Sequence, residues 1–483
     1  MLQAWREKVE KDLGGVAFER ALVTVLAGGL RIEPLYEDAS ALRLARSGAL
    51  RLAAMCHAGQ EPPSVDPGEG RWIVGSTTKQ GDPTHVHEWS AEGVTHVCEG
   101  ERPLAHALDV HDQGGSIPLE LAVSVARALD AIRRGGEAHV AVAVGTETFV
   151  EVAKLRALRA LLERASAALG ARSAVRILAR TSLVGFSRIE PETNALRATS
   201  SVVGAILGGA DLVACAPYDL LSPSDSTRAR AAHLASTTGL VAVLESHLAV
   251  ADDPLRGAYF VETATSQMIE AAWPIVREIE RQGGAAAAEP WRARLTDEGR
   301  ERQRAACTGK LPRVGATRLA RVDAPMLGPT HASFAHVLRD AAAFEALRDE
   351  RIARRTTVLV AGDPKKTAAR AEYLREVLAT WGAEVSTARV ASASDSIARV
   401  SGAVTDAVVI CAEDADLGAL PPLARALSAR SCVMVAGRPG AHESALREAG
   451  VAAFVHLGAD LPAVARAFYG APVPSGAASG GVS

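Results

Sequence analysis

The chain has 483 residues, of which 48% are hydrophobic and 23% charged, and its formal net charge is −3. These values are typical of a globular protein of about three domains and exclude a strongly basic nucleic-acid-binding surface. No stretch reaches the ~18 apolar residues of a membrane span, and the N-terminus lacks the apolar run of a secretion signal. Six scattered cysteines form no C-x-x-C pair, which favours a reducing cytoplasm over a disulfide scaffold or a structural zinc site.

Residues 1–50 are predicted to form an N-terminal arm. Leu2, Trp5, Val9 and Leu13 follow the spacing of one helical face, and glycines 14–15 end the pattern. A helix this short is marginal alone in water, so its apolar face needs a cover, either the rest of this chain or a partner chain. The residues expected at a partner contact are Trp5, Leu13, Ile32, Pro34, Leu35 and Tyr36.

Residues 51–283 alternate short apolar runs with longer helical patterns such as Phe149–Leu169. Repeated strand–helix units predict a parallel sheet covered by helices, and a region of this length suits a single (β/α)8 barrel of the TIM type. The predicted strands include Trp72–Ser76, Val94–Cys98, His139–Val144, Val175–Thr181, Asp211–Ala216 and Leu240–Glu245.

A linker is predicted over residues 284–355, because small residues mark its start and Arg, Asp and Pro are frequent within it. Residues 356–471 contain five apolar runs, each followed by a helical pattern, which indicates a doubly wound, flavodoxin-like parallel sheet. Residues 472–483 are expected to be disordered. The predicted strands of the last domain are Thr357–Ala361, Glu384–Val390, Ala407–Cys411, Cys432–Ala436 and Ala453–His456.

Several short motifs favour structural rather than chemical roles. His85, His87 and His96 have no nearby acidic or cysteine residue at ligand spacing, so a metal site is disfavoured. The pair Gly114–Gly115 with Ser116 could hold a phosphate at a helix start, whereas Gly208–Gly209 more simply ends a helix. The serines without a G-x-S-x-G context, which makes a hydrolase a poor interpretation, are Ser187, Ser224 and Ser226.

Three strings resemble sequences of the methylmalonyl-CoA mutase family. The first combines residues 9–13 with Ile32-Glu33-Pro34-Leu35-Tyr36, the second runs from Glu190 to Thr199, and the third is Asp253-Pro254-Leu255-Arg256-Gly257 continued to Glu262. Each string alone is weak, but their order along nearly the whole chain is specific. The resemblance implies an N-terminal arm, a barrel and a C-terminal flavodoxin-like domain. It also implies a radical rearrangement of methylmalonyl-CoA to succinyl-CoA that uses adenosylcobalamin.

The positions that carry chemistry in this family differ in the chain. The resemblance implies a histidine that hydrogen-bonds the substrate thioester carbonyl, and Leu178 occupies its place. A leucine cannot donate to that oxygen or stabilise charge on it. The family also presents a tyrosine near its first barrel strand, and residues 72–77 contain none. We therefore expect no catalytic residue at these positions.

The cofactor motif is altered in the same way. Cobalamin-binding members carry D-x-H-x-x-G after the first strand of the last domain, where the imidazole can ligate cobalt. Here Asp363 is retained, but Lys365 replaces the histidine and Ala368 the glycine. The sequence thus predicts neither a metal ligand nor cobalamin on this chain, with adenosylcobalamin held by a partner subunit.

The resemblance is closest to the small subunit of heterodimeric family members, which keeps the fold without the chemistry. We expect a non-catalytic subunit that binds a larger catalytic mutase subunit. Two alternatives stay open: an independent acyl-CoA mutase with a diverged cofactor site, and a stand-alone regulatory or assembly protein that binds an acyl-CoA.

Overall fold

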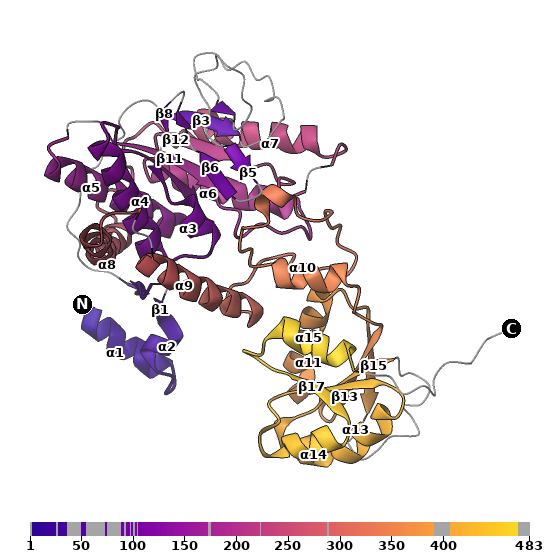
Figure 1. Ribbon diagram of the computed structural model, residues 1–483. Helices are drawn as coiled ribbons and strands as arrows, with labels where there is room; N and C mark the ends of the chain where they lie inside the picture. The colour runs from indigo at the N-terminus through magenta and orange to yellow at the C-terminus, as the bar shows by residue number, and fades with distance from the viewer. Residues whose placement is uncertain are drawn as a thin grey trace. The chain divides into compact units, whose positions relative to one another are not determined.

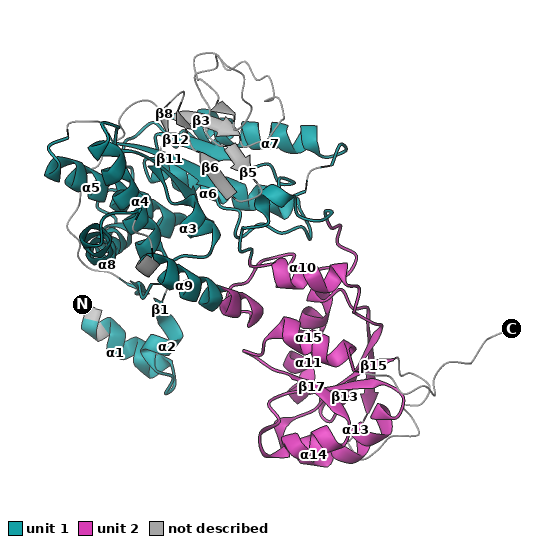
Figure 2. Cartoon of the chain, viewed as in Figure 1, with its two compact units in different colours: residues 1–302, 327–339 teal, residues 303–326, 340–483 magenta. Residues whose placement is uncertain are grey.

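A computed structural model of the protein describes residues 2–25, 28–35, 50–54, 73–74, 88–90, 93–96, 98–99, 102–103, 105–171, 175–222, 224–286, 289–390 and 406–471. These residues form two compact units (Figure 2). Unit 1 comprises residues 1–302 and 327–339, and unit 2 comprises residues 303–326 and 340–483. Figure 1 labels the elements of both units. None of the helices in the described ranges has an apolar stretch long enough to cross a lipid bilayer.

Unit 1 contains a six-stranded, wholly parallel sheet with the strand order β4-β3-β12-β11-β10-β9. The last strand of the sheet in the sequence, β12, therefore pairs with the first, β3. The strands are β3 (Arg51–Ala54), β4 (Ile73–Val74), β9 (Ala105–His106), β10 (His139–Val144), β11 (Arg176–Thr181) and β12 (Leu212–Cys215).

Helices α4, α5 and α8 pack against one another beside this sheet (Figure 1). All six residues of β10 are buried, as a strand covered on both faces requires. The helices of unit 1 that follow the arm are α3 (Leu108–Asp112), α4 (Ile117–Arg133), α5 (Thr148–Ala168), α6 (Thr193–Leu207), α7 (Arg228–Leu240), α8 (Tyr259–Arg281), α9 (Glu289–Cys307) and the short 3-10 helix η2 (Ala332–Phe334). The last residues of α9 belong to unit 2.

Two of the predicted strands do not lie in the parallel sheet. Val94–Cys98 is extended as predicted, but β6 (Gly93–His96) pairs antiparallel with β5 (Glu88–Ser90), and β7 (Cys98–Glu99) with β8 (Arg102–Pro103). The spacing of β5 and β6 is that of a hairpin, which the apolar run alone does not reveal. Leu240–Glu245 continues α7 as a π-helix, η1 (Val241–Glu245), because a short apolar run is compatible with either element.

The arm contains α1 (Leu2–Asp12), α2 (Phe18–Leu22) and a small antiparallel pair, β1 (Thr24–Val25) with β2 (Arg31–Ile32). Phe18 is buried, and its ring meets Trp5 edge-on with centroids 5.9 Å apart. The Arg6 guanidinium lies 4.4 Å from the centre of the same ring. The arm is therefore folded upon itself, with Trp5 and Arg6 covering Phe18.

Unit 2 contains a five-stranded parallel sheet with the order β14-β13-β15-β16-β17. Residues 303–326 and 340–355, expected as part of a linker, belong to this unit and include α10 (Ala342–Asp349). The remaining elements are β13 (Thr356–Ala361), α11 (Pro364–Thr380), β14 (Val385–Val390), β15 (Ala407–Cys411), η3 (Asp414–Ala419), α13 (Pro421–Ser428), β16 (Cys432–Ala436), η4 (Gly440–His442), α14 (Glu443–Glu448), β17 (Val451–Val455) and α15 (Leu461–Tyr469).

Two layers of apolar side chains cover the two faces of this sheet. One includes Trp381 and Phe468, and the other includes Leu359 and Ile410. β13 and β15 are neighbours, with β14 outside β13 and β16 outside β15. The order of the strands thus reverses between β13 and β15, and the carboxyl ends of these two strands define the crevice where ligands bind in open parallel sheets.

Candidate functional site

Polar side chains gather at the carboxyl ends of β9, β10 and β11 in unit 1. His111 and Asp112 come from α3, directly after β9. Arg180 lies near the carboxyl end of β11, and Ser182 directly follows that strand. Because parallel strands present their carboxyl ends at one edge, residues far apart in the sequence meet there. The helices add Glu120 from α4, with Glu151 and Lys154 from α5.

His111 lies between a hydroxyl and a carboxylate. Its Nε2 is 2.7 Å from Ser182 Oγ, and its Nδ1 is 3.2 Å from Glu120 Oε2. The backbone N–H of Val184 also donates to Ser182 Oγ, at 3.3 Å. Sequence analysis gave no role to His111, Glu120 or Ser182, because the three come from separate elements and share no local motif.

Glu120 and Lys154 form an ion pair at this edge, and each side chain is only 1% exposed. Lys154 Nζ lies 3.3 Å from Glu120 Oε2 and 2.6 Å from Glu151 Oε2, and it donates to the Ala143 carbonyl at 2.6 Å. Although burial by itself raises the pKa of Glu120, Lys154 and His111 lower it to about 2. The carboxylate of Glu120 is thus ionised at neutral pH.

Arg180 and Asp112 form a second buried pair. The Arg180 Nη2 lies 2.6 Å from both carboxylate oxygens, and both side chains are fully buried. Burial raises the pKa of Asp112, but Arg180 and His336 outweigh it and bring the value to about 2. This pair fixes α3 to the end of β11.

Leu178, at the family's histidine position, is buried in the apolar core of unit 1, with 4% of its surface exposed. It lies opposite Ala141 of β10 and Leu212 of β12. Leu178 and Arg180 share one face of β11 because they are two residues apart. At the carboxyl end of this face the polar group is Arg180, and Asp112 already binds it. Of residues 72–77 the structure describes only Ile73 and Val74.

At the carboxyl edge of the unit 2 sheet, the loop after β13 turns at once into α11. Asp363 is the N-cap of that helix, and its side chain accepts a hydrogen bond from the Lys365 backbone N–H at 2.9 Å. Lys365 and Ala368 are exposed, and Lys366 pairs with Glu413 at 3.2 Å. The retained acidic residue thus stabilises the first turn of a helix, and no imidazole lies on that turn.

Arg370 of α11 binds the carboxyl ends of β15 and β16, beside the crevice. Its guanidinium donates to the Ala412 carbonyl just past β15, to the Ala436 carbonyl at the end of β16 at 3.4 Å, and to Asp414 Oδ1 at 2.7 Å. A cobalt centre needs a neutral nitrogen donor, whereas this edge holds lysine and arginine cations paired with carboxylates. The residues of the crevice do not fit cobalamin.

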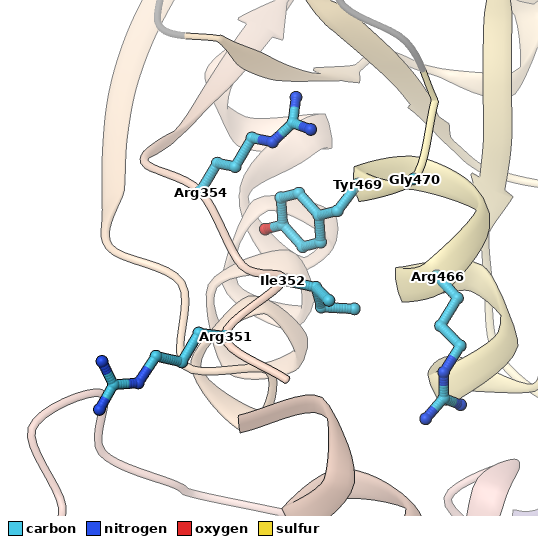
Figure 3. Close-up of a pocket in the computed structure, with 6 residues that line it drawn as sticks. All are labelled: Arg351, Ile352, Arg354, Arg466, Tyr469 and Gly470. Carbon is cyan, nitrogen blue, oxygen red and sulfur yellow. The ribbon is translucent and has the colours of Figure 1, made fainter. Parts of the chain in front are cut away.

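A cavity of about 410 Å³ lies elsewhere in unit 2 (Figure 3). It is at the amino end of the sheet, since the Tyr469 hydroxyl is 2.8 Å from the hydroxyl of Thr356, the first residue of β13. This cavity therefore cannot extend the crevice near Asp363. Its lining residues are Arg351, Ile352, Arg354, Arg466, Tyr469 and Gly470.

The motifs weighed for phosphate or hydrolase roles make internal contacts. Ser116, the N-cap of α4, donates through its N–H and its hydroxyl to the carboxylate of Glu298, at 2.7 and 2.9 Å. An internal carboxylate thus occupies the anion position at this helix start. Gly208 is the C-cap of α6, and Gly209 follows with a φ of 78°. Ser187 is buried, and Ser224 and Ser226 hydrogen-bond each other.

The histidines weighed for a metal site lie largely beyond the structure. His85 and His87 are outside the described residues, and for His96 only the backbone, in β6, is described. Within the described part of the chain, no three His, Cys, Asp or Glu residues are grouped to hold a metal ion.

The arm residues predicted at a partner contact are partly open to solvent. Trp5, Leu13 and Ile32 are half-buried, and Pro34 and Leu35 are exposed. Tyr36 lies outside the described residues.

The strings that resemble the mutase family hold the fold of unit 1 together. Asn194 accepts a hydrogen bond from the Ser187 N–H at 3.0 Å and donates to the carbonyls of Ser187 and Tyr218. Arg156 of α5 pairs with Asp253 and, at 2.7 Å, with Glu262. These polar contacts are buried, so the resemblance is carried by residues that fasten loops to helices.

Comparison with known protein sequences agrees with the resemblance carried by these strings. The family profile described as methylmalonyl-CoA mutase matches residues 107–397. A Mycobacterium tuberculosis protein named "Probable methylmalonyl-CoA mutase small subunit" is 30% identical over 83% of this chain and 70% of its own length. A "Methylmalonyl-CoA mutase small subunit" of Streptomyces virginiae is 32% identical over 50% of this chain and 42% of its own length. The chain belongs to the methylmalonyl-CoA mutase family.

Proposed function

We propose that this chain is the small, non-catalytic subunit of a heterodimeric, adenosylcobalamin-dependent methylmalonyl-CoA mutase. One observation carries the proposal: the buried contacts of Asn194 and Arg156 are in place, while Leu178 and Lys365 stand where the family's two reactive histidines are expected. The chain thus keeps the residues that build the fold and lacks those that would carry the rearrangement. The isomerase activity belongs to the complex, through its larger subunit.

The strand order of unit 1 supports a barrel origin. In an eight-stranded (β/α)8 barrel the last strand pairs with the first, and β12 pairs with β3 in this way. Read from β3, the order along the sheet follows the sequence cyclically through β4, β9, β10, β11 and β12. In the described residues β4 and β9 are the edges of this sheet, so the pairing of β12 with β3 is the feature shared with a barrel. We therefore propose that unit 1 derives from the family's barrel.

Unit 2 has the strand order of flavodoxin-like sheets, the fold that carries cobalamin in the resemblance. The carboxyl edge of the sheet lacks a donor nitrogen on the first turn of α11 and is bound by Arg370. We place adenosylcobalamin on the larger subunit for this reason. The four cysteines whose side chains the structure describes are free thiols, which is compatible with the reducing cytoplasm that we propose for the complex.

The proposed partner is a larger mutase subunit, because relatives of this chain are named small subunits. The arm is the proposed contact: Leu30 of the arm packs in the core of unit 1, while Leu35 is exposed and Trp5 half-buried. Interfaces of obligate complexes bury large apolar areas. Such an interface would cover the side chains that the folded arm leaves open.

Co-expression with a larger mutase subunit from the same cell tests the proposal. We expect a one-to-one complex that binds adenosylcobalamin and isomerises methylmalonyl-CoA, and an isolated chain that does neither. Leu35→Glu should weaken the complex about tenfold or more. Leu457→Glu is the matched control, since Leu457 is an exposed leucine (74%) of unit 2, outside the arm, and should leave assembly unchanged.

Two outcomes would overturn the proposal. An isolated chain that isomerises methylmalonyl-CoA with bound cofactor would be an independent mutase. A homodimer that binds methylmalonyl-CoA without converting it, and that ignores the larger subunit, would be a stand-alone acyl-CoA-binding protein.

A further inference from the structure

We infer that Ser182, His111 and Glu120 form a nucleophile–base–carboxylate triad that hydrolyses acyl thioesters. The two contacts that define such a triad are present, at 2.7 Å from Ser182 Oγ to His111 Nε2 and 3.2 Å from His111 Nδ1 to Glu120 Oε2. The inference goes beyond the proposed subunit role, because it concerns a chemistry other than the rearrangement and requires no partner.

The charge of Glu120 fixes the direction of both hydrogen bonds. An ionised carboxylate only accepts, so the Nδ1 of His111 must donate to it. In a neutral imidazole the other nitrogen, Nε2, then carries a lone pair and accepts from the Ser182 hydroxyl. The Val184 N–H donates to the same oxygen from the backbone side. The neutral form of His111 that this arrangement selects is the tautomer that a general base for Ser182 requires.

Lys154 keeps the carboxylate in this role. It is buried beside Glu120 and is itself fastened to the Ala143 carbonyl, so its ammonium cannot move away from the pair. The charge of Lys154 lowers the pKa of Glu120 against the effect of burial, and so does the hydrogen bond from His111. Glu120 therefore stays an acceptor for Nδ1–H over the whole neutral range.

The reactive atoms are also at the more open end of the triad. The side chain of Glu120 is 1% exposed and that of His111 is 16% exposed, and Ser182 retains 8% of its surface. The edge formed by the carboxyl ends of β9–β11 is where active sites lie in proteins built from repeated β/α units.

The reaction follows from these positions. Ser182 Oγ attacks the thioester carbonyl while His111 Nε2 takes the hydroxyl proton, and an oxygen–carbon bond forms. The carbon–sulfur bond breaks, and His111 gives its proton to the departing thiolate. Water, deprotonated by His111, then attacks the acyl-serine ester, and His111 returns the proton to Ser182 Oγ as the carbon–oxygen bond to the serine breaks. The products are a carboxylic acid and a thiol, without any further reactant.

The turn after β11 differs from a glycine-flanked nucleophile elbow, since Arg180 and Val184 occupy the flanking positions of Ser182. A search for the G-x-S-x-G motif therefore does not find Ser182. Arg180 is tied to Asp112 and holds the strand end that presents the serine. The site is recognised by geometry, as convergent triads are.

The test uses the purified full-length chain, without a larger subunit. We expect a fluorophosphonate to add once per chain, at Ser182 by peptide mass spectrometry, and acetyl-CoA to release free thiol. Ser182→Ala should abolish the labelling, and His111→Gln should lower both rates by about 10²-fold or more. Ser226→Ala, which removes an exposed serine outside the triad, should change neither rate.

Melting temperatures of the variants establish that each is folded. Ser182→Cys provides a second readout that needs no hydrolysis, because the base should speed alkylation of the introduced thiol by iodoacetamide, and His111→Gln in that background should remove the gain. The inference would be overturned if the folded natural chain resisted the fluorophosphonate and the thiol of the Ser182→Cys variant showed no acceleration. The three side chains would then be a structural hydrogen-bond chain only, and the proposed subunit role would stand unchanged.

Discussion

The carboxyl edges of the two parallel sheets of this chain carry ion pairs that differ in burial. In unit 1 the edge is filled by ion pairs with almost no exposed surface, such as Arg180–Asp112 and Lys154–Glu120. In unit 2 the pairs Lys366–Glu413 and Arg370–Asp414 each leave at least one side chain well exposed, at 64% and 74%. Only the first edge therefore holds a buried network of charged side chains.

The difference has an energetic consequence. A charge in the interior that loses its partner keeps the desolvation cost without the compensating attraction. A charge near water recovers its hydration when its partner is removed. The edge of unit 1 should therefore be intolerant of single substitutions, and that of unit 2 tolerant. This contrast can be tested with changes of decreasing expected size.

The largest effect is expected for Asp112→Ala, which strands the fully buried Arg180. We expect the free energy of unfolding of unit 1 to fall by about 3–5 kcal/mol. Hydrogen exchange of the β11 amides, read by mass spectrometry, measures this for unit 1 separately from unit 2. The double variant Asp112→Leu/Arg180→Met removes both charges and should recover most of the loss. A small loss in the single variant would show that water reaches Arg180.

The next effect is a dependence of stability on pH that is centred on His106. Burial, opposed by Asp109, lowers the pKa of His106 to about 4, and its Nδ1 makes no hydrogen bond within the described residues. In the unfolded chain His106 binds a proton near pH 6.5, whereas in the folded chain it binds one only near pH 4. Stability should be full above pH 6.5 and should decrease by about 3 kcal/mol as the pH falls to 4.

Acidification below pH 4 should then protonate Asp112 and Glu120, whose folded-state pKa values are both about 2. Their contribution is present above the ordinary carboxyl pKa and is lost as the pH falls through 2. His106→Phe is the control: the decline between pH 6.5 and 4 should disappear, and the decline at lower pH should remain. An unchanged slope would assign the pH dependence to another group.

A smaller effect is expected for Asp363→Ala in unit 2. Removing the N-cap hydrogen bond to Lys365 should cost about 1 kcal/mol in the stability of α11. Asp363→Asn keeps an acceptor and should cost little. Asp460→Ala, which removes the equivalent cap of α15, is the matched comparison. Hydrogen exchange of the first amides of each helix provides the measurement.

The sequence was sufficient for elements whose pattern is local. β15 and β16 have the predicted bounds, and α5 differs from its prediction by one residue at each end. It failed where a short apolar run had more than one solution, as at Leu240–Glu245, which is helical. Register and pairing decide such cases, and neither can be read from a single segment.

The sequence could propose site positions only where a resemblance marks them. Lys365 and Ala368 are matched to the D-x-H-x-x-G motif and Leu178 to a family strand, and these assignments stay predictions. The groups that meet at the unit 1 edge carry no such mark: Arg180 and Asp112 are 68 residues apart, and His111 and Ser182 are 71 apart. Their meeting depends on the parallel order of β9, β10 and β11, which the apolar runs alone do not specify.

The smallest effect is expected from restoring the cofactor motif in unit 2. Lys365→His with Ala368→Gly recreates D-x-H-x-x-G on a turn that is already helical, one residue before Lys366 and near Arg370. Because Arg370 still binds Ala436 beside the crevice, we expect no imidazole-type shift in the absorbance of aquacobalamin at roughly micromolar to tens-of-micromolar protein. Adding Arg370→Ala is the informative extension, since it removes the guanidinium that binds the ends of β15 and β16. If the double variant already binds aquacobalamin, the crevice is intact and this chain lacks only the histidine and the glycine of the motif. If only the triple variant binds aquacobalamin, Arg370 is the group that blocks the crevice.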